Sequence, residues 1–132
     1  IILGARITGK DWLKGGIQIK DSIYLVKKLK EIGLDYVCVS SGGIKTITNL
    51  NVKSKYNINI AKKIKSETAI LTRVAGNFKN ISQANNVLKK NKVDIVAFAR
   101  AYLKNPNFLF NKKSIMEYQQ DIPKPYLRGF KV

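Results

Sequence analysis

The sequence predicts an α/β fold built on a parallel sheet. Four short apolar runs rich in strand-forming residues are each followed by an amphipathic stretch, so strands and helices should alternate. A helix in each connection makes the strands parallel, with right-handed crossovers. The strands lack clean polar alternation, as expected when both faces are covered. Four such units form either half of an eight-stranded barrel or a small doubly wound sheet, and periodicity does not choose between them.

The first unit spans the opening quarter of the chain. The apolar run Ile1–Ile7 predicts a strand, and a Gly15–Gly16 turn precedes a helix expected from about Asp21 to Ile32. Apolar residues three or four apart should form its buried face, namely Ile23, Leu25, Val26, Leu29 and Ile32. Gly33 stands where a left-handed glycine would end this helix.

The second unit begins with the strand Asp35–Val39, which is rich in β-forming residues. It ends in Ser40-Ser41-Gly42-Gly43, and a polar loop of about a dozen residues follows, a length that suggests a functional loop. A helix is expected from about Asn57 to Glu67. Its inward side should carry Ile60, Ala61 and Ile64.

The third and fourth units complete the pattern. A strand over Ala69–Ala75 ends at Gly76, and Ser82 is expected to cap the next helix. The inward residues of that helix should be Ala84, Val87 and Leu88. The fourth strand, Asp94–Ala99, ends at Arg100.

Length and composition exclude several classes of protein. The 132 residues allow one domain, and no apolar run approaches the roughly 18 residues of a transmembrane helix. One cysteine and no histidine exclude an internal disulfide framework, most zinc sites and every His-dependent mechanism. We therefore assign no metal site and no catalytic residue to this chain. Because it opens with Ile rather than Met, we expect it to be part of a longer protein.

The formal net charge of +17 comes from lysine, with 21 Lys against 4 Arg. The lysines are scattered through every segment, which is typical of a solvated surface. A basic RNA-associated α/β module is the alternative interpretation. Neither an aromatic-interleaved basic stripe nor a known RNA-binding motif is present, which argues against a nucleic-acid partner.

The scarce arginines are more informative, because a chain that uses lysine for ordinary charge uses arginine where a planar, bidentate donor is needed. They are Arg6, Arg73, Arg100 and Arg128. In either architecture, sites form at the carboxyl ends of the strands. Those ends carry Arg6, Ser40–Gly43, Gly76 and Ala99–Arg100.

These strand ends suit an anionic, phosphate-bearing ligand. Glycines let the backbone approach a phosphate, and the helix N-termini behind them supply N–H groups. Tight turns, helix caps and a simple salt bridge are the structural alternatives for the same residues. Neither a dinucleotide-binding glycine fingerprint nor a P-loop pattern is present.

Four further residues have interpretations of their own. Cys38 lies in mid-strand and is interpreted as a small buried hydrophobe rather than a reactive thiol. Trp12 would either face a ligand or cover the mouth of a barrel. Asp35 and Asp94 each open a strand, which places them at the end away from the site.

The same segments resemble the old yellow enzyme family of FMN-dependent ene-reductases, most closely its short NADPH dehydrogenase branch. The likeness covers nearly the whole chain in order. The segments and their counterparts are Arg6–Trp12 with Gly15-Gly16 for the fifth strand, Val39–Gly43 for the sixth, Thr72–Gly76 for the seventh, Asp94–Pro106 for the eighth and Ile122–Phe130 for the C-terminal tail.

The resemblance implies a TIM (β/α)8 barrel that binds FMN. NAD(P)H would reduce the flavin, and the flavin would pass hydride to an activated alkene. Residues 1–120 would form the C-terminal half of the barrel, strands five to eight, and residues 121–132 an extended tail. The full-length protein would be a cytoplasmic NADPH dehydrogenase and a homo-oligomer, and this fragment alone is expected to be inactive. Another FMN barrel, such as a tRNA-dihydrouridine synthase, is the enzymatic alternative.

The resemblance also assigns roles to individual residues. Arg6 would lie by the flavin ring, while Arg100 and Ala99 would hold the FMN phosphate together with the backbone of Gly76. Arg128 would reach the substrate in a neighbouring subunit. The chain departs from the family at Arg73, where a smaller residue is usual. Ala99 also replaces a frequent glycine.

Overall fold

The computed structural model describes residues 1–42 and 56–108. The chain divides into two compact units, residues 1–99 and 100–132, and each is described by itself. The first unit contains β1 (Gly4–Thr8), α1 (Ile19–Glu31), β2 (Tyr36–Ser40), α2 (Tyr56–Thr68), β3 (Leu71–Ala75), α3 (Ile81–Lys89) and β4 (Ile95–Ala97). In the second unit the described residues include the short helix α4 (Arg100–Lys104).

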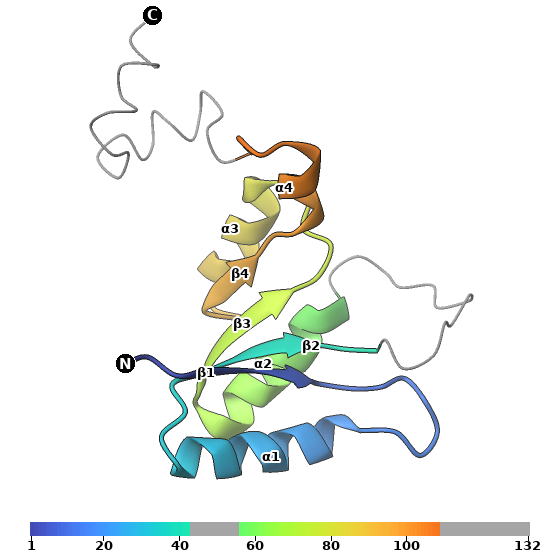
Figure 1. The fold of residues 1–132 in the computed structure, drawn as a ribbon, viewed down its shortest axis with the longest axis vertical. Helices are drawn as coiled ribbons and strands as arrows, with labels where there is room; N and C mark the ends of the chain where they lie inside the picture. Colours follow the sequence, from blue (N-terminus) through green and yellow to red (C-terminus); the bar gives the residue numbers. More distant parts are fainter. Residues whose placement is uncertain (43–55, 109–132) are drawn as a thin grey trace, which may run out of the picture. The chain divides into compact units, whose positions relative to one another are not determined.

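The four strands form one sheet in the order β1-β2-β3-β4, and every neighbouring pair is parallel (Figure 1). This confirms the predicted α/β class. Sequential strand order with right-handed crossovers places the connecting helices on the same face of the sheet. Five strand residues pack against the helices and are buried: Ile7, Val37, Val39, Thr72 and Val74.

The opposite face of the sheet is open within the described residues, so the expectation that both faces are covered is wrong for this unit. Successive side chains of a strand point to opposite faces. The residues that alternate with the buried ones include Arg6, Cys38 and Arg73, which are in register across β1, β2 and β3. Two apolar residues of this face, Leu71 and Ile95, are 54% and 41% exposed.

Helix α1 ends as predicted, but its buried face is narrower. Gly33 has a φ of +96°, its N–H donates to the Lys30 carbonyl at 3.0 Å, and the next N–H donates to Leu29 at 3.1 Å. These paired bonds complete a left-handed glycine cap. The buried side chains are Ser22 and Val26, whereas Leu25 and Ile32 are exposed, because they lie off the stripe defined by Val26.

The other two long helices bury most of the predicted apolar residues, but the start of α3 differs. Ile60, Ala61 and Ile64 of α2 are buried, as are Ala84 and Val87 of α3, while Leu88 is half-buried against the core. The cap of α3 is Asn80 rather than Ser82: its backbone is extended and its side-chain oxygen accepts the N–H of Gln83 at 2.9 Å. No helix in residues 1–42 and 56–108 is long and apolar enough to cross a membrane.

Two aspartates join neighbouring strands at the N-terminal end of the sheet. The Asp35 carboxylate accepts the N–H of Leu3 at 2.7 Å, and its own N–H donates to the Leu3 carbonyl at 2.9 Å. Asp94 makes the same pair of bonds to Thr72, at 2.9 and 3.0 Å. Both aspartates therefore lie at the predicted end, where they hold the main chain of one strand to the start of another.

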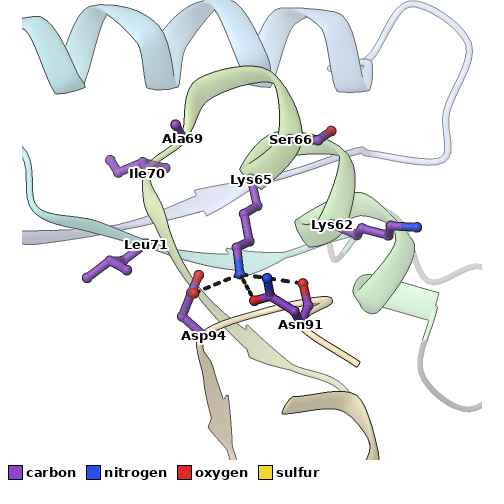
Figure 2. A pocket seen from close by; sticks show the side chains of 8 residues that line it. All are labelled: Lys62, Lys65, Ser66, Ala69, Ile70, Leu71, Asn91 and Asp94. Atoms are coloured by element: carbon purple, nitrogen blue, oxygen red, sulfur yellow. Dashed lines mark hydrogen bonds and ion pairs between the residues drawn. The ribbon is translucent and has the colours of Figure 1, made fainter. Parts of the chain in front are cut away.

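Lys65 of α2 reaches the second of these aspartates (Figure 2). Its Nζ donates to Asp94 Oδ1 at 2.8 Å and to Asn91 Oδ1 at 2.6 Å. Burial of the Asp94 carboxyl raises its pKa, but the hydrogen bonds from Lys65 and Thr72 together outweigh burial, so that the pKa lies below the ordinary 3.8. The ionised carboxylate therefore stabilises the folded state.

We predict that Asp94→Asn lowers the free energy of unfolding of the intact protein by about 1–3 kcal/mol at pH 7. The stabilisation that Asp94 gives the folded state is complete at pH values above the ordinary carboxyl pKa. It is lost as the pH falls through the lower pKa that this carboxyl has in the folded protein. The difference between wild type and variant should therefore shrink on acidification. Chemical denaturation between pH 7 and pH 3 measures it.

The matched control is Glu31→Gln, which removes the carboxylate of an exposed helical ion pair with Lys28 and should change stability little. Equal stability of wild type and Asp94→Asn at pH 7 would show that the ion pair does not stabilise the fold.

Candidate functional site

A cavity of about 350 Å³ lies on the open face of the sheet. All four strands contribute to it, together with the two residues that follow β4. The lining residues are Gly4, Ala5, Arg6, Tyr36, Cys38, Arg73, Ala75, Ala97, Phe98 and Ala99. All of them belong to the first compact unit.

Two guanidinium groups give this cavity its charge. Arg6 is the middle residue of β1 and Arg73 the middle residue of β3, with Cys38 of β2 in register between them. The Arg6 Nε donates to Ser40 Oγ at a long 3.4 Å, and Arg73 makes no hydrogen bond or ion pair with any described residue. Among residues 1–42 and 56–108, no carboxylate lines the cavity. The arrangement therefore suits an anion.

The other lining residues leave room for a flat ligand. Ala75 of β3 and Ala97 of β4 are in register, and Ala99 follows two residues later. Cys38 is 8% exposed, which agrees with its interpretation as a buried hydrophobe. Small side chains towards the carboxyl ends of β3 and β4 thus accompany the two arginines.

The predicted site residues are only partly brought together by the described structure. Arg6 and Ala99 line the same cavity. Gly76 follows β3 and lies beside Asn57, outside the lining set. Arg100 begins α4 in the second compact unit, and Arg128 lies outside the described residues. Convergence of all these groups on one ligand stays a prediction.

A chain of hydrogen bonds links the carboxyl ends of β1, β2 and β3. Trp12 Nε1 donates to Ser41 Oγ at 3.0 Å, which donates to Asn57 Oδ1 at 2.6 Å. Asn57 Nδ2 then donates to the carbonyl of Ala75 at 2.7 Å. Asn57 is only 3% exposed. The Asn57 side chain therefore connects the carboxyl ends of three neighbouring strands through hydrogen bonds.

Sequence reasoning missed Asn57, although a signal was present. Asn57 precedes Ala61 by four residues and Ile64 by seven, so it lies on the buried stripe of α2. A polar side chain on such a stripe must find hydrogen-bond partners, because leaving it unpaired costs free energy.

Trp12 covers the strand ends. Its φ of +62° is unusual for a bulky residue. The ring meets Tyr56 edge to face at 6.2 Å between centroids, and Lys10 Nζ lies 4.9 Å from the ring centroid. With its indole N–H already donated to Ser41, Trp12 has a packing role, which favours the covering interpretation.

Asp11 closes the loop between β1 and α1. Its N–H donates to the Ile17 carbonyl at 2.9 Å, and its Oδ2 accepts the Ile17 N–H at 2.8 Å. A Cβ added at Gly16 would lie 2.8 Å from the Asp11 Cβ, so glycine is needed there. Asp11 is 4% exposed, and its Oδ1 has no partner among the described residues.

A second cavity, of about 370 Å³, lies at the opposite end of the strands, around Lys65 and Asp94 (Figure 2). Two of the charged groups that line it, Lys65 and Asp94, form an ion pair, and Lys65 also donates to Asn91. This cavity belongs to the N-terminal end of the sheet, where we assign it a structural role.

The model of the NADH:flavin oxidoreductase / NADH oxidase family matches residues 2–119. The chain is 30% identical to an NADPH dehydrogenase of Clostridium acetobutylicum over 126 residues, which cover 95% of this chain and 37% of the relative. It is 31% identical to an NADPH dehydrogenase of Geobacillus thermodenitrificans, covering 98% of this chain and 38% of the relative. The chain thus spans a little over a third of these relatives.

Two solved structures share the fold. A 2-naphthoyl-CoA reductase superposes with a TM-score of 0.67 at 17% identity, over 85% of this chain and 17% of that one. Morphinone reductase superposes with a TM-score of 0.57 at 22% identity, over 80% of this chain and 27% of that one. These likenesses concern the fold alone. The family model and the named relatives favour the NADH:flavin oxidoreductase / NADH oxidase family over the dihydrouridine synthase and RNA-module alternatives.

We predict that Asn57→Ala lowers the free energy of unfolding of the intact protein by about 1–3 kcal/mol, because the partly buried Ala75 carbonyl loses its donor. Asn59→Ala is the matched control: it changes the same residue type on the same helix at an exposed position. Chemical denaturation of both variants compares them. Equal losses of stability would contradict the role assigned to the Asn57 side chain.

Proposed function

Because the chain belongs to the NADH:flavin oxidoreductase / NADH oxidase family, the old yellow enzyme family, we propose that the open face of its sheet is the cofactor side of an FMN-dependent oxidoreductase. The intact protein would take electrons from NAD(P)H and reduce an activated alkene. The observation that carries the proposal is the cavity on that face, which the described residues line with two guanidinium groups and no carboxylate.

The residues of this cavity fit FMN. The cofactor is anionic and contains a large flat ring system. Arg6 and Arg73 supply positive charge, and Ala75, Ala97 and Ala99 leave space towards the carboxyl ends of their strands. The backbone φ at position 76 does not require glycine. A Cβ added to Gly76 would make only ordinary van der Waals contacts, the nearest at 3.6 Å to Asn57. Approach of a ligand to its backbone is a reason for glycine at this position.

We propose that residues 1–120 form the C-terminal half of an eight-stranded barrel, strands five to eight, and residues 121–132 an extended tail. Support comes from the strand order β1-β2-β3-β4, the parallel pairing and the single covered face. In a closed barrel the open face becomes the interior, and the outer edges of β1 and β4 pair with further strands. The chain spans 37% and 38% of two NADPH dehydrogenase relatives, which is less than half of each.

Each residue then has a defined task. Arg6 holds the flavin ring and favours negative charge on it, because its guanidinium faces the cavity. Ala99, Arg100 and the Gly76 backbone hold the phosphate at the carboxyl ends of β3 and β4, where barrels commonly bind one. When bound, FMN supplies the two-electron chemistry. The protein orients it and sets its electrostatic surroundings.

The substrate and the assembly follow from the same proposal. Arg128 contacts substrate in the active site of a neighbouring subunit, so the working enzyme is a homo-oligomer. We place it in the cytoplasm, with a small activated alkene as its substrate.

We predict that Arg100→Ala in the intact protein weakens FMN binding about 10- to 100-fold, because a charge-assisted hydrogen bond to phosphate is lost. Lys89→Ala removes a positive charge from the exposed end of α3 and is the control. The flavin absorbance retained after dialysis, compared with protein concentration, measures both variants. Equal flavin retention in the two would count against the phosphate role.

A further inference from the structure

We propose that Arg73 is a second anion-binding arm of the cavity, acting beside Arg6 on the ring system of the bound flavin. This inference rests on the proposed function, since it presumes that the cavity holds FMN. It goes beyond that function because two arginines on two different strands, rather than one, would supply the positive charge around the flavin ring.

The sheet places the two arginines as a pair. Arg6, Cys38 and Arg73 occupy the same level of β1, β2 and β3. Neighbouring strands lie about 4.8 Å apart, so the backbones of the two arginines are separated by about 10 Å across the sheet. Both side chains line the same cavity. They therefore approach one ligand from two sides of Cys38.

The charge of Arg73 has no counterion among the described residues. Its side chain is partly buried and makes no hydrogen bond or ion pair there. Asp94, which precedes the register partner of Arg73 on the neighbouring strand β4, is already bound by Lys65 and Thr72. Because a partly buried, unpaired guanidinium loses hydration without compensation, an anionic ligand would stabilise it.

The use of arginine in this chain points the same way. Only 4 of the 25 basic residues are arginine, yet both basic residues that the described part of the chain contributes to the cavity are arginine, and none of the lysines described in the structure lines it. Lysine is a strongly hydrated point charge, whereas a guanidinium forms a planar, pre-organised fork that packs well against a flat anion. A chain that uses lysine elsewhere therefore has arginine at both positions where such a fork is useful.

The level of Arg73 in the sheet favours the ring over the phosphate. Arg73 lies three residues before Gly76, in the middle of β3, and Arg6 lies at the same level of β1. Phosphate groups bind at strand ends and helix N-termini. Mid-strand guanidinium groups are thus better placed for the ring, and two of them should favour the reduced cofactor, which carries more negative charge.

The test compares Arg73→Gln and Arg73→Lys with wild type in the intact protein. Dissociation constants for FMN and for riboflavin are measured by fluorescence, and the midpoint potential of bound FMN by spectroelectrochemical titration. In Arg73→Gln we expect binding of reduced flavin to weaken about tenfold more than binding of oxidised flavin, which lowers the potential by about 30 mV. Arg73→Lys keeps the positive charge, so it should lower the midpoint potential less than Arg73→Gln does. Binding of FMN and binding of riboflavin should weaken by the same factor.

Lys62→Gln, an exposed change on α2, is the control and should leave the potential unchanged. An unchanged potential in Arg73→Gln, with or without a loss of stability, would overturn the inference and leave the arginine a structural residue. Weaker binding of FMN but not of riboflavin would also overturn it, because it would place Arg73 on the phosphate. Failure of the wild-type protein to bind any flavin would instead overturn the proposed function.

Discussion

Side chains alternate across a parallel sheet whose helices lie on one face, and the rest of the structure depends on that alternation. Val37, Val39 and Val74 point into the helical layer and are fully buried. The residues between them must point the other way, which places Arg6 and Arg73 together on the open face. Packing of the core therefore determines which side chains can contact a ligand, although the core residues themselves do not contact the ligand.

The two ends of the sheet serve different purposes. At the N-terminal end, Asp35 and Asp94 bind main-chain groups of neighbouring strands, and Lys65 neutralises the second carboxylate. At the carboxyl end, the network through Asn57 holds the loops after three strands. At the first end the Asp94 charge is paired with Lys65. On the open face two positive groups have no counterion among the described residues, and this imbalance is the reason we propose that face as the binding side.

Local patterns predicted the elements well, because strands and helices depend on neighbouring residues. The helix expected from Asp21 to Ile32 is found at Ile19–Glu31, and Gly33 ends it as anticipated. Predictions were wrong where a neighbouring residue suited the position better than the residue that local preference selected. Ser82 is a good helix cap, but Asn80 precedes it with an extended backbone and the correct reach to Gln83.

The candidate site was less predictable, because its contacts join distant parts of the chain. Reasoning from strand ends selected Arg6 and Ala99, which do line one cavity, but it was wrong about the position of Arg6, which lies in the middle of β1. The bonds from Trp12 to Ser41 and from Ser41 to Asn57 span 29 and 16 residues, which no local pattern encodes. The pairing of Arg73 with Arg6 required the strand register, which only the folded sheet provides.

The central claim is that the open face of this sheet holds FMN between its arginines. A crystal structure of the intact protein grown with FMN tests it most directly. The account predicts electron density for the flavin ring against the mid-strand level of β1 and β3, within hydrogen-bond distance of the Arg6 guanidinium. Flavin bound elsewhere, with the Arg6 and Arg73 side chains paired to carboxylates of the protein, would contradict it.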